Sequence, residues 1–143
     1  MKGTYVLLAE VSKPIKVRTG ALGVLEFGKG FYAYVGSGMN SLEKRIGRHF
    51  LAKKTKHWHI DYFLEKAKSL AVFYAETGRK EECGVSARLA EKFKGVRGFG
   101  CSDCGCASHL YYSENRKELE REAVRSLRGS RPLRRILRKS RAS

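Results

Sequence analysis

The amino-acid sequence contains no glutamine, and its asparagines are Asn40 and Asn115. The charged residues lysine, arginine and glutamate are abundant instead. Side-chain amides are thermolabile, and proteins from hyperthermophiles contain few of them. The composition therefore predicts a thermophilic source.

Long apolar runs are also missing from the sequence. No stretch approaches the roughly 18 residues that a membrane-spanning helix needs, and the start of the chain, Met1 to Thr4, lacks the apolar centre of a secretory signal. Apolar side chains nevertheless make up 42% of the 143 residues, which is enough for one folded domain with its own core. We expect a cytoplasmic protein with no membrane partner.

Acidic residues are scarce. The chain has 14 Asp and Glu against 30 Lys and Arg, a formal net charge of +16. Such a surplus repels itself in the folded state and is typical of proteins that bind a polyanion. Nucleic acid is the first candidate partner, with DNA favoured over RNA, and an anionic membrane surface is the weaker second one.

Apolar periodicity and turn residues predict an ordered series of strands and helices. Ser41 is the predicted N-cap of the first helix. The strands at 3–10 and 31–36 both carry tyrosine motifs and should form a hairpin-like antiparallel pair. Strands are expected at 3–10, 15–18, 24–27, 31–36, 70–75 and, at an edge, 110–112, and helices at 42–50, 59–64, 80–94 and from 114 to Gly129.

The composition changes at Glu114. From there to the end, 11 Lys and Arg stand against 4 Glu, a net charge of +7. We therefore divide the chain into a domain at 1–112 and a basic, helical C-terminal extension at 113–143. A charge density of this kind binds phosphates without sequence preference, and its affinity falls with salt. The arginines expected to bind nucleic acid there are Arg131, Arg134, Arg135 and Arg138.

A second basic segment lies between the first two predicted helices and is expected to face nucleic acid. Trp58 would stack on a base there or anchor the loop to the core. His57 and His59 flank it but are two residues apart, so they would diverge on a helix and are not favoured as joint metal ligands with Asp61. The lysines of this segment that would bind nucleic acid are Lys53, Lys54 and Lys56.

Three of the four cysteines fall in one loop, with the spacing Cys101-x2-Cys104-x-Cys106-x2-His109. In the cytoplasm, metal ligation or reduced thiols are favoured over disulfides. Three thiols and one imidazole match the ligands of tetrahedral Zn²⁺, although the middle spacing is tight. A turn with reduced cysteines and a single disulfide are the alternatives. Cys83, on the predicted helix 80–94, is interpreted as a small core residue.

Several short motifs occur in an order that resembles a known nuclease superfamily. Gly3-Thr4-Tyr5 lies in the first strand, Tyr34-Val35-Gly36 ends a later one, and Arg45 follows on a helix with His49 four residues on, which places both on one helix face. This order resembles the GIY-YIG nucleases. Further segments resemble one branch of them, catalogued as a domain of unknown function (DUF123) and sometimes fused to endonuclease III: Gly30–Ser37, His57–Tyr62, Glu82-Cys83 and Phe99–Leu110.

The resemblance runs from Gly3 to about Tyr112. It implies an α+β fold with a small, mainly antiparallel three-stranded sheet and flanking helices. It also implies a metal-dependent endonuclease that hydrolyses phosphodiester bonds of DNA, in repair or recombination. The catalytic residues would be Tyr5, Tyr34, Arg45, His49 and Glu82.

The resemblance gives these residues their roles. Tyr5 or Tyr34 would help to deprotonate the attacking water. Because a free phenol has a pKa of about 10, Arg45 and the metal would have to lower that pKa. Arg45 would also stabilise the charge that grows on the phosphoryl oxygens, and His49 would position the water or relay a proton. Tyr32 is a further candidate for the site or a core residue.

The resemblance also indicates metal ligands. Glu82 would hold one Mg²⁺ or Mn²⁺, with Glu81 in its place if the register differs by one residue. In the cysteine loop, the branch keeps the second and third cysteines and the histidine. This puts Cys104, Cys106 and His109 ahead of the first cysteine as zinc ligands.

The chain departs from the superfamily pattern at two points. Thr4 stands where the first motif has its isoleucine, and its side chain is expected to face the core. No asparagine lies between Asn40 and Asn115, whereas many of these nucleases carry one near the phosphate late in the domain. Ser108 or His109 would take its place.

The alternative interpretation is a non-catalytic DNA- or RNA-binding module on the same scaffold, stabilised by zinc. A carboxylate beside phosphates weakens binding by repulsion, so a binding module would have no physical need for Glu82. The nuclease is therefore the favoured interpretation.

Overall fold

The computed structural model describes residues 1–51, 55–101 and 105–127 in full, and residues 128 and 133–137 by their backbone. The strands and helices predicted from the sequence are all present, with ends that differ by a few residues. In chain order they are β1 (Gly3–Val11), β2 (Ile15–Arg18), η1 (Gly20–Leu22), β3 (Val24–Phe27), β4 (Gly30–Gly38), α1 (Leu42–Arg48), α2 (His59–Phe63), β5 (Lys68–Glu76), α3 (Glu82–Ala90), β6 (Lys94–Gly95), β7 (Leu110–Ser113), α4 (Arg116–Arg128) and β8 (Leu133–Leu137).

The fold is α+β, as predicted, and its main sheet is antiparallel throughout. The strand order is β6-β7-β4-β1-β5-β8, and β2 and β3 form a separate hairpin. The predicted core strands β4, β1 and β5 lie side by side at its centre. The predicted number of three strands is wrong, because short strands extend both edges. β6 has two residues, and β8 lies in the basic segment, where Arg134-Arg135 interrupts the alternation that marks a strand.

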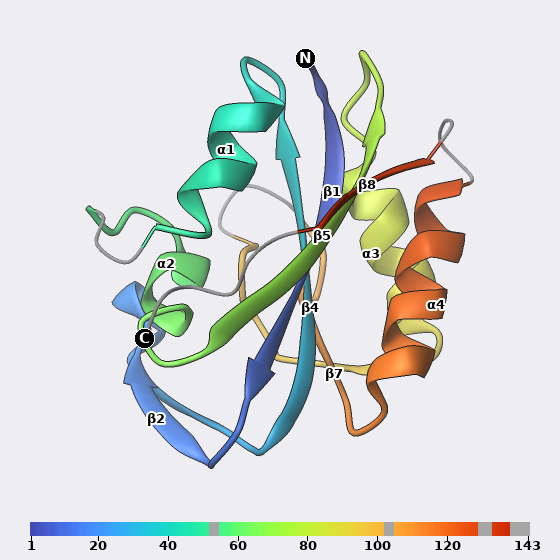
Figure 1. Ribbon diagram of the computed structural model, residues 1–143. Helices are drawn as coiled ribbons and strands as arrows, with labels where there is room; N and C mark the ends of the chain where they lie inside the picture. The colour runs from blue at the N-terminus through green and yellow to red at the C-terminus, as the bar shows by residue number, and fades with distance from the viewer. Residues whose placement is uncertain (52–54, 102–104, 129–132, 138–143) are drawn as a thin grey trace.

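Side chains of β1 alternate between two buried faces of the sheet. Tyr5 and Leu7 belong to one apolar cluster, with residues of α1 and α2. Val6 and Leu8 belong to a second cluster, with residues of α3 and α4. Figure 1 shows the sheet nearly edge-on, with α1 and α2 on one side and α3 and α4 on the other. A strand covered on both faces reads as a continuous apolar run, as β1 does.

The helix α4 packs on the sheet beside α3. Its N-terminal turn is capped by Asn115, whose side-chain oxygen accepts a hydrogen bond from a backbone amide of that turn, 3.0 Å away. Its apolar residues Leu119, Ala123 and Leu127 are fully buried. The first half of the segment predicted as a C-terminal extension thus contributes to the same core as the strands.

The short helix α1 positions two residues of the predicted site. Ser41 caps it as predicted, because its hydroxyl accepts from the Lys44 amide at 3.3 Å. Arg45 lies in its last turn, and His49 is its C-cap. None of the helices in the described part of the chain is long and apolar enough to cross a membrane.

Candidate functional site

A pocket of about 390 Å³ opens beside β4. The strand β7 pairs only with residues 31–34 of β4, so the end of β4 is left beside the pocket. Side chains from both helical layers reach it. It is lined by Tyr34, Ser37, Arg45, His57, Trp58, His59, Lys80, Glu82, Cys83, Gly100 and His109.

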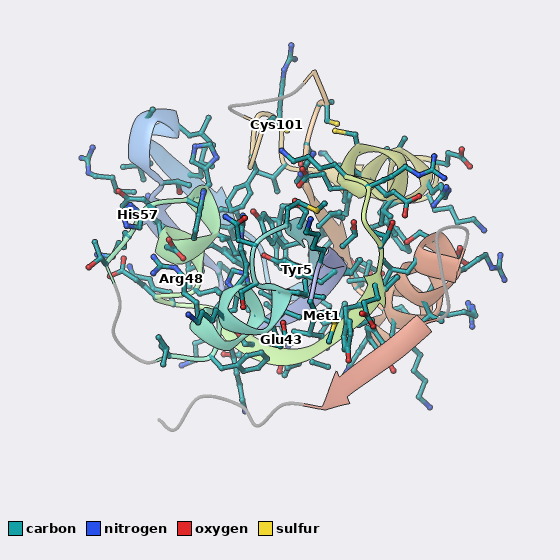
Figure 2. The ribbon with its side chains drawn as sticks, turned by 90° about the horizontal axis from the view of Figure 1, so that it is seen from above. Met1, Tyr5, Glu43, Arg48, His57 and Cys101 are labelled. Carbon is teal, nitrogen blue, oxygen red and sulfur yellow. The ribbon has the colours of Figure 1, made fainter. Side chains whose placement is uncertain are left out.

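The five predicted catalytic residues lie together but at two depths. Tyr34, Arg45 and Glu82 line the pocket. Tyr5 and His49 are fully buried behind it, and the Tyr5 hydroxyl lies 2.6 Å from His49 Nε2. Figure 2 shows Tyr5 in the interior of the molecule.

The two phenols are less acidic than the predicted mechanism requires. Burial raises the pKa of Tyr34 to about 12, and the nearby Arg45 offsets only part of this effect. Burial also raises the pKa of Tyr5 well above its usual value, again against the influence of Arg45. We expected Arg45 to lower these pKa values, but loss of solvation has the larger effect. At neutral pH both hydroxyls keep their protons.

Gly36 explains why the two tyrosine motifs occur together. It lies opposite Tyr5 in the register of β1 and β4, and the Tyr5 ring crosses directly over it. A Cβ at position 36 would overlap the Tyr5 hydroxyl. The glycine of the second motif thus provides the space for the tyrosine of the first.

Replacing Gly36 with alanine is therefore expected to lower the free energy of unfolding by about 1–3 kcal/mol, the usual cost of overpacking, and to displace Tyr5 from His49. Chemical denaturation measures this loss. Gly78→Ala is the matched control, because a Cβ there would meet nothing within 4 Å. Equal stability of the two variants would show that Tyr5 is not held against Gly36.

Tyr32, the further candidate, belongs to the core. It is buried, and its hydroxyl donates to the carbonyl of Gly28 at 2.7 Å. Thr4 is also fully buried, as predicted for the residue in place of the motif isoleucine.

The guanidinium of Arg45 lies between the phenols and Trp58. Its carbon Cζ is 4.2 Å from the centroid of the Trp58 ring, and Cζ of Arg48 is 5.1 Å from it. Such stacking orients a guanidinium. The Nε–H of Arg45 is buried and has no hydrogen-bond partner among the described residues. A buried donor without a partner is costly, and an anionic ligand would supply one.

Asp61 holds Arg48 and the segment that carries Trp58 in place beside the pocket. Its Oδ2 accepts hydrogen bonds from Arg48 Nη2 at 2.9 Å and from the amides of His57 and Trp58 at 2.8 and 3.0 Å. Burial alone would raise the pKa of Asp61, but these hydrogen bonds outweigh it and hold the pKa below its usual range. Asp61 thus ties α1 to the 57–58 segment. In Figure 2, Arg48 and His57 lie on the same side of the molecule.

On the opposite wall, the structure distinguishes between the two candidate acids. Glu82 lies in the first turn of α3 and lines the pocket, whereas Glu81 precedes the helix and is not among the lining residues. Of the two expected substitutes for asparagine, His109 lines the pocket. The Ser108 hydroxyl instead bonds the backbone of Leu110 at 2.9 Å.

Cys83, Cys106 and His109 form a group that could hold a metal ion. Their ligand atoms all lie within 4.8 Å of one another. The interpretation of Cys83 as a core residue is wrong, because it is exposed. The buried face of α3 carries Val85 and Leu89, and Cys83 lies about 200° around the helix from Val85, facing away from the core.

The predicted zinc loop is only partly within this group. Cys106 and His109 belong to it, whereas the thiol of Cys101 donates to the carbonyl of Phe99 at 3.3 Å. Cys104 lies outside the described residues. A metal-binding group is thus present, with a ligand from α3 that loop spacing does not reveal.

The structure describes some of the predicted nucleic-acid-binding residues and not others. Trp58 lines the pocket and is 38% exposed, so one part of its ring is accessible to a base. Lys56 pairs with Glu65 at 2.9 Å on the surface. Arg134 and Arg135 lie on β8, opposite Tyr74 and Phe73 of β5. Outside the described residues are Lys53, Lys54, Arg131 and Arg138.

Comparison with known proteins agrees with the resemblance to the DUF123 family. Residues 4–131 match the family described as Domain of unknown function DUF123. No curated protein and no solved structure matches the chain. Because the match covers most of the sequence, the chain belongs to the DUF123 family.

Proposed function

We propose that the protein is a metal-dependent endonuclease of the GIY-YIG type that hydrolyses phosphodiester bonds of DNA, in repair or recombination. One observation carries the proposal: Tyr34, Arg45 and Glu82, from three separate elements, line one pocket, and the Tyr5–His49 pair lies directly behind it. A guanidinium, a hydroxyl and a carboxylate in one solvent-open pocket are groups that phosphoryl transfer uses.

Arg45 is the group that binds the scissile phosphate. Its position is fixed by Trp58 on one side and the phenols on the other. A guanidinium can donate two parallel hydrogen bonds to phosphate oxygens. It therefore stabilises the negative charge that accumulates there as the water attacks.

Tyr34 acts as a hydrogen-bond donor rather than as a base. With a pKa of about 12, its hydroxyl is protonated at neutral pH and can donate to the attacking water or to a phosphate oxygen. The Tyr5 hydroxyl is hydrogen-bonded to His49 Nε2. It lies next to Arg45 at the base of the pocket and helps to orient that guanidinium. His49 is placed to exchange a proton with Tyr5.

Glu82 is the residue that would hold Mg²⁺ or Mn²⁺. It is the one carboxylate among the lining residues that the structure describes, and a single carboxylate in an open pocket fits an ion that keeps most of its water ligands. When bound, such an ion supplies positive charge that polarises a phosphodiester oxygen and favours ionisation of water.

The charge of the whole chain supports a nucleic-acid substrate. The net charge is +16, and Arg45 and Lys80 outnumber Glu82 in the pocket. A cleft with a net positive charge concentrates a polyanion around it and speeds its association.

The test is a cleavage assay with the full chain. Labelled single-stranded, duplex, nicked and branched DNAs, with RNA of the same sequence, are incubated with Mg²⁺, with Mn²⁺ or without added divalent ion. We expect at least one DNA to be cut with added metal only. Binding of these substrates with no cleavage under any condition would contradict the proposal.

A second candidate function is the non-catalytic nucleic-acid-binding module. Two observations favour it: both phenols are held protonated by burial, and a thiol–imidazole group adjoins the pocket. The same assay separates the two functions. A binding module slows the migration of DNA on a native gel at low salt and leaves the DNA intact.

A further inference from the structure

We propose that Cys83, Cys106 and His109 bind a zinc ion that joins α3 to the segment leading into β7, at the wall of the pocket. This site is separate from the Mg²⁺ or Mn²⁺ ligand Glu82 and does not depend on the proposed nuclease function. It rests on one side chain of α3 and two side chains of a loop that follows 23 to 26 residues later, which come together only in the fold.

The separations are close to those of a zinc site. Zn–S bonds of about 2.3 Å in a tetrahedral site place two sulfur atoms about 3.8 Å apart. The three ligand atoms here lie within 4.8 Å of one another, so shifts of about 1 Å per side chain complete the geometry. Two thiols and an imidazole are soft and borderline donors, which favour Zn²⁺ over Mg²⁺.

The hydrogen bonding of His109 prepares it as a ligand. Its Nδ1 lies 3.2 Å from the carbonyl oxygen of Val35. A carbonyl only accepts, so Nδ1 carries the proton and Nε2 is the basic nitrogen. A backbone carbonyl that orients a metal-binding histidine in this way is typical of zinc sites.

The position of Cys83 explains what the ion does. Cys83 follows Glu82 directly in the first turn of α3, where the helix dipole favours a negative ligand. Cys106 and His109 precede β7, next to the pocket. One ion bound by all three side chains would therefore fix the first turn of α3, and with it Glu82, relative to the segment that leads into β7. Three protein ligands leave the fourth position of a tetrahedral site to water.

The experiment measures zinc directly in the full chain. The purified protein is expected to contain one zinc per chain by elemental analysis, and its melting temperature should fall when a chelator removes the ion. Replacement by Co²⁺ should give the absorption of a tetrahedral site with sulfur-to-cobalt charge transfer. Cys83→Ser, Cys106→Ser and His109→Ala should each weaken binding by more than about 100-fold, the upper cost of losing a supporting partner alone.

Cys101→Ser is the matched control, because its thiol donates to a carbonyl instead, and it should retain one zinc. Three results would overturn the proposal: no zinc bound even after reconstitution, a disulfide between Cys83 and Cys106 by mass spectrometry of the reduced and unreduced protein, or loss of zinc in Cys101→Ser with retention in Cys83→Ser. Zinc content is independent of cleavage, so either proposal can fail alone.

Discussion

The Arg45→Met variant is expected to bind DNA and to cleave it about 100- to 1,000-fold more slowly than the wild type, the cost of removing one donor to a developing oxyanion. Arg45 lines the pocket, interacts with both phenols and has a buried Nε–H without a partner among the described residues. Methionine keeps much of the apolar part of the side chain, so the change removes mainly the charged guanidinium. Single-turnover cleavage at saturating enzyme measures the chemical step.

Two further variants make this test specific. Arg18→Met removes the same charge from an exposed position on β2, and it should change binding slightly and the cleavage rate not at all. Arg45→Lys keeps the charge but loses the planar fork, so it should recover only part of the rate. If Arg45→Met and Arg18→Met cleave equally fast, Arg45 acts only through the overall charge, and the proposed role in catalysis fails.

The sequence predicted the strands and helices of the fold better than it predicted how deeply the site residues are buried. The β-branched and aromatic residues of β1, the Ser41 cap and the order of the tyrosine motifs are local patterns, and each appears in the structure. Burial depends on what the other elements cover. Tyr5 and Tyr34 carry the same phenol near a strand end, but Tyr5 is sealed behind His49 while Tyr34 reaches the pocket.

The sequence also did not predict the contacts between segments that are distant along the chain. Cys83 lies 23 residues before Cys106 and 26 before His109, so loop spacing favoured Cys101 in its place. The helical period could have shown that Cys83 faces away from the Val85–Leu89 stripe. The period could not show which loop lies opposite, because that contact is set by the packing of α3 on the sheet.

The Asp61→Asn variant is expected to lose about 3–5 kcal/mol of unfolding free energy, because it leaves Arg48 facing a buried group that no longer carries charge. The Asp61 side chain is fully buried and its partner Arg48 is 21% exposed, so solvent screens this pair weakly. Asp61 also holds the amides of His57 and Trp58. The surface pair of Lys56 and Glu65 has the same 2.9 Å separation but is 37% and 49% exposed. Glu65→Gln is thus the control and should cost less than about 1 kcal/mol.

The pH dependence of this loss in unfolding free energy tests whether the charge of Asp61 causes it. The pKa of Asp61 is held below its usual range in the folded protein, whereas in the unfolded chain it is near ~3.9. A carboxyl whose pKa falls on folding stabilises the protein above the unfolded pKa, and this stabilisation is lost as the pH drops towards the folded pKa. The difference in unfolding free energy between wild type and Asp61→Asn should therefore be full at pH 7 and shrink below about pH 4. A difference that stays constant from pH 7 to pH 3 would assign the loss to packing and hydrogen-bond geometry instead of charge.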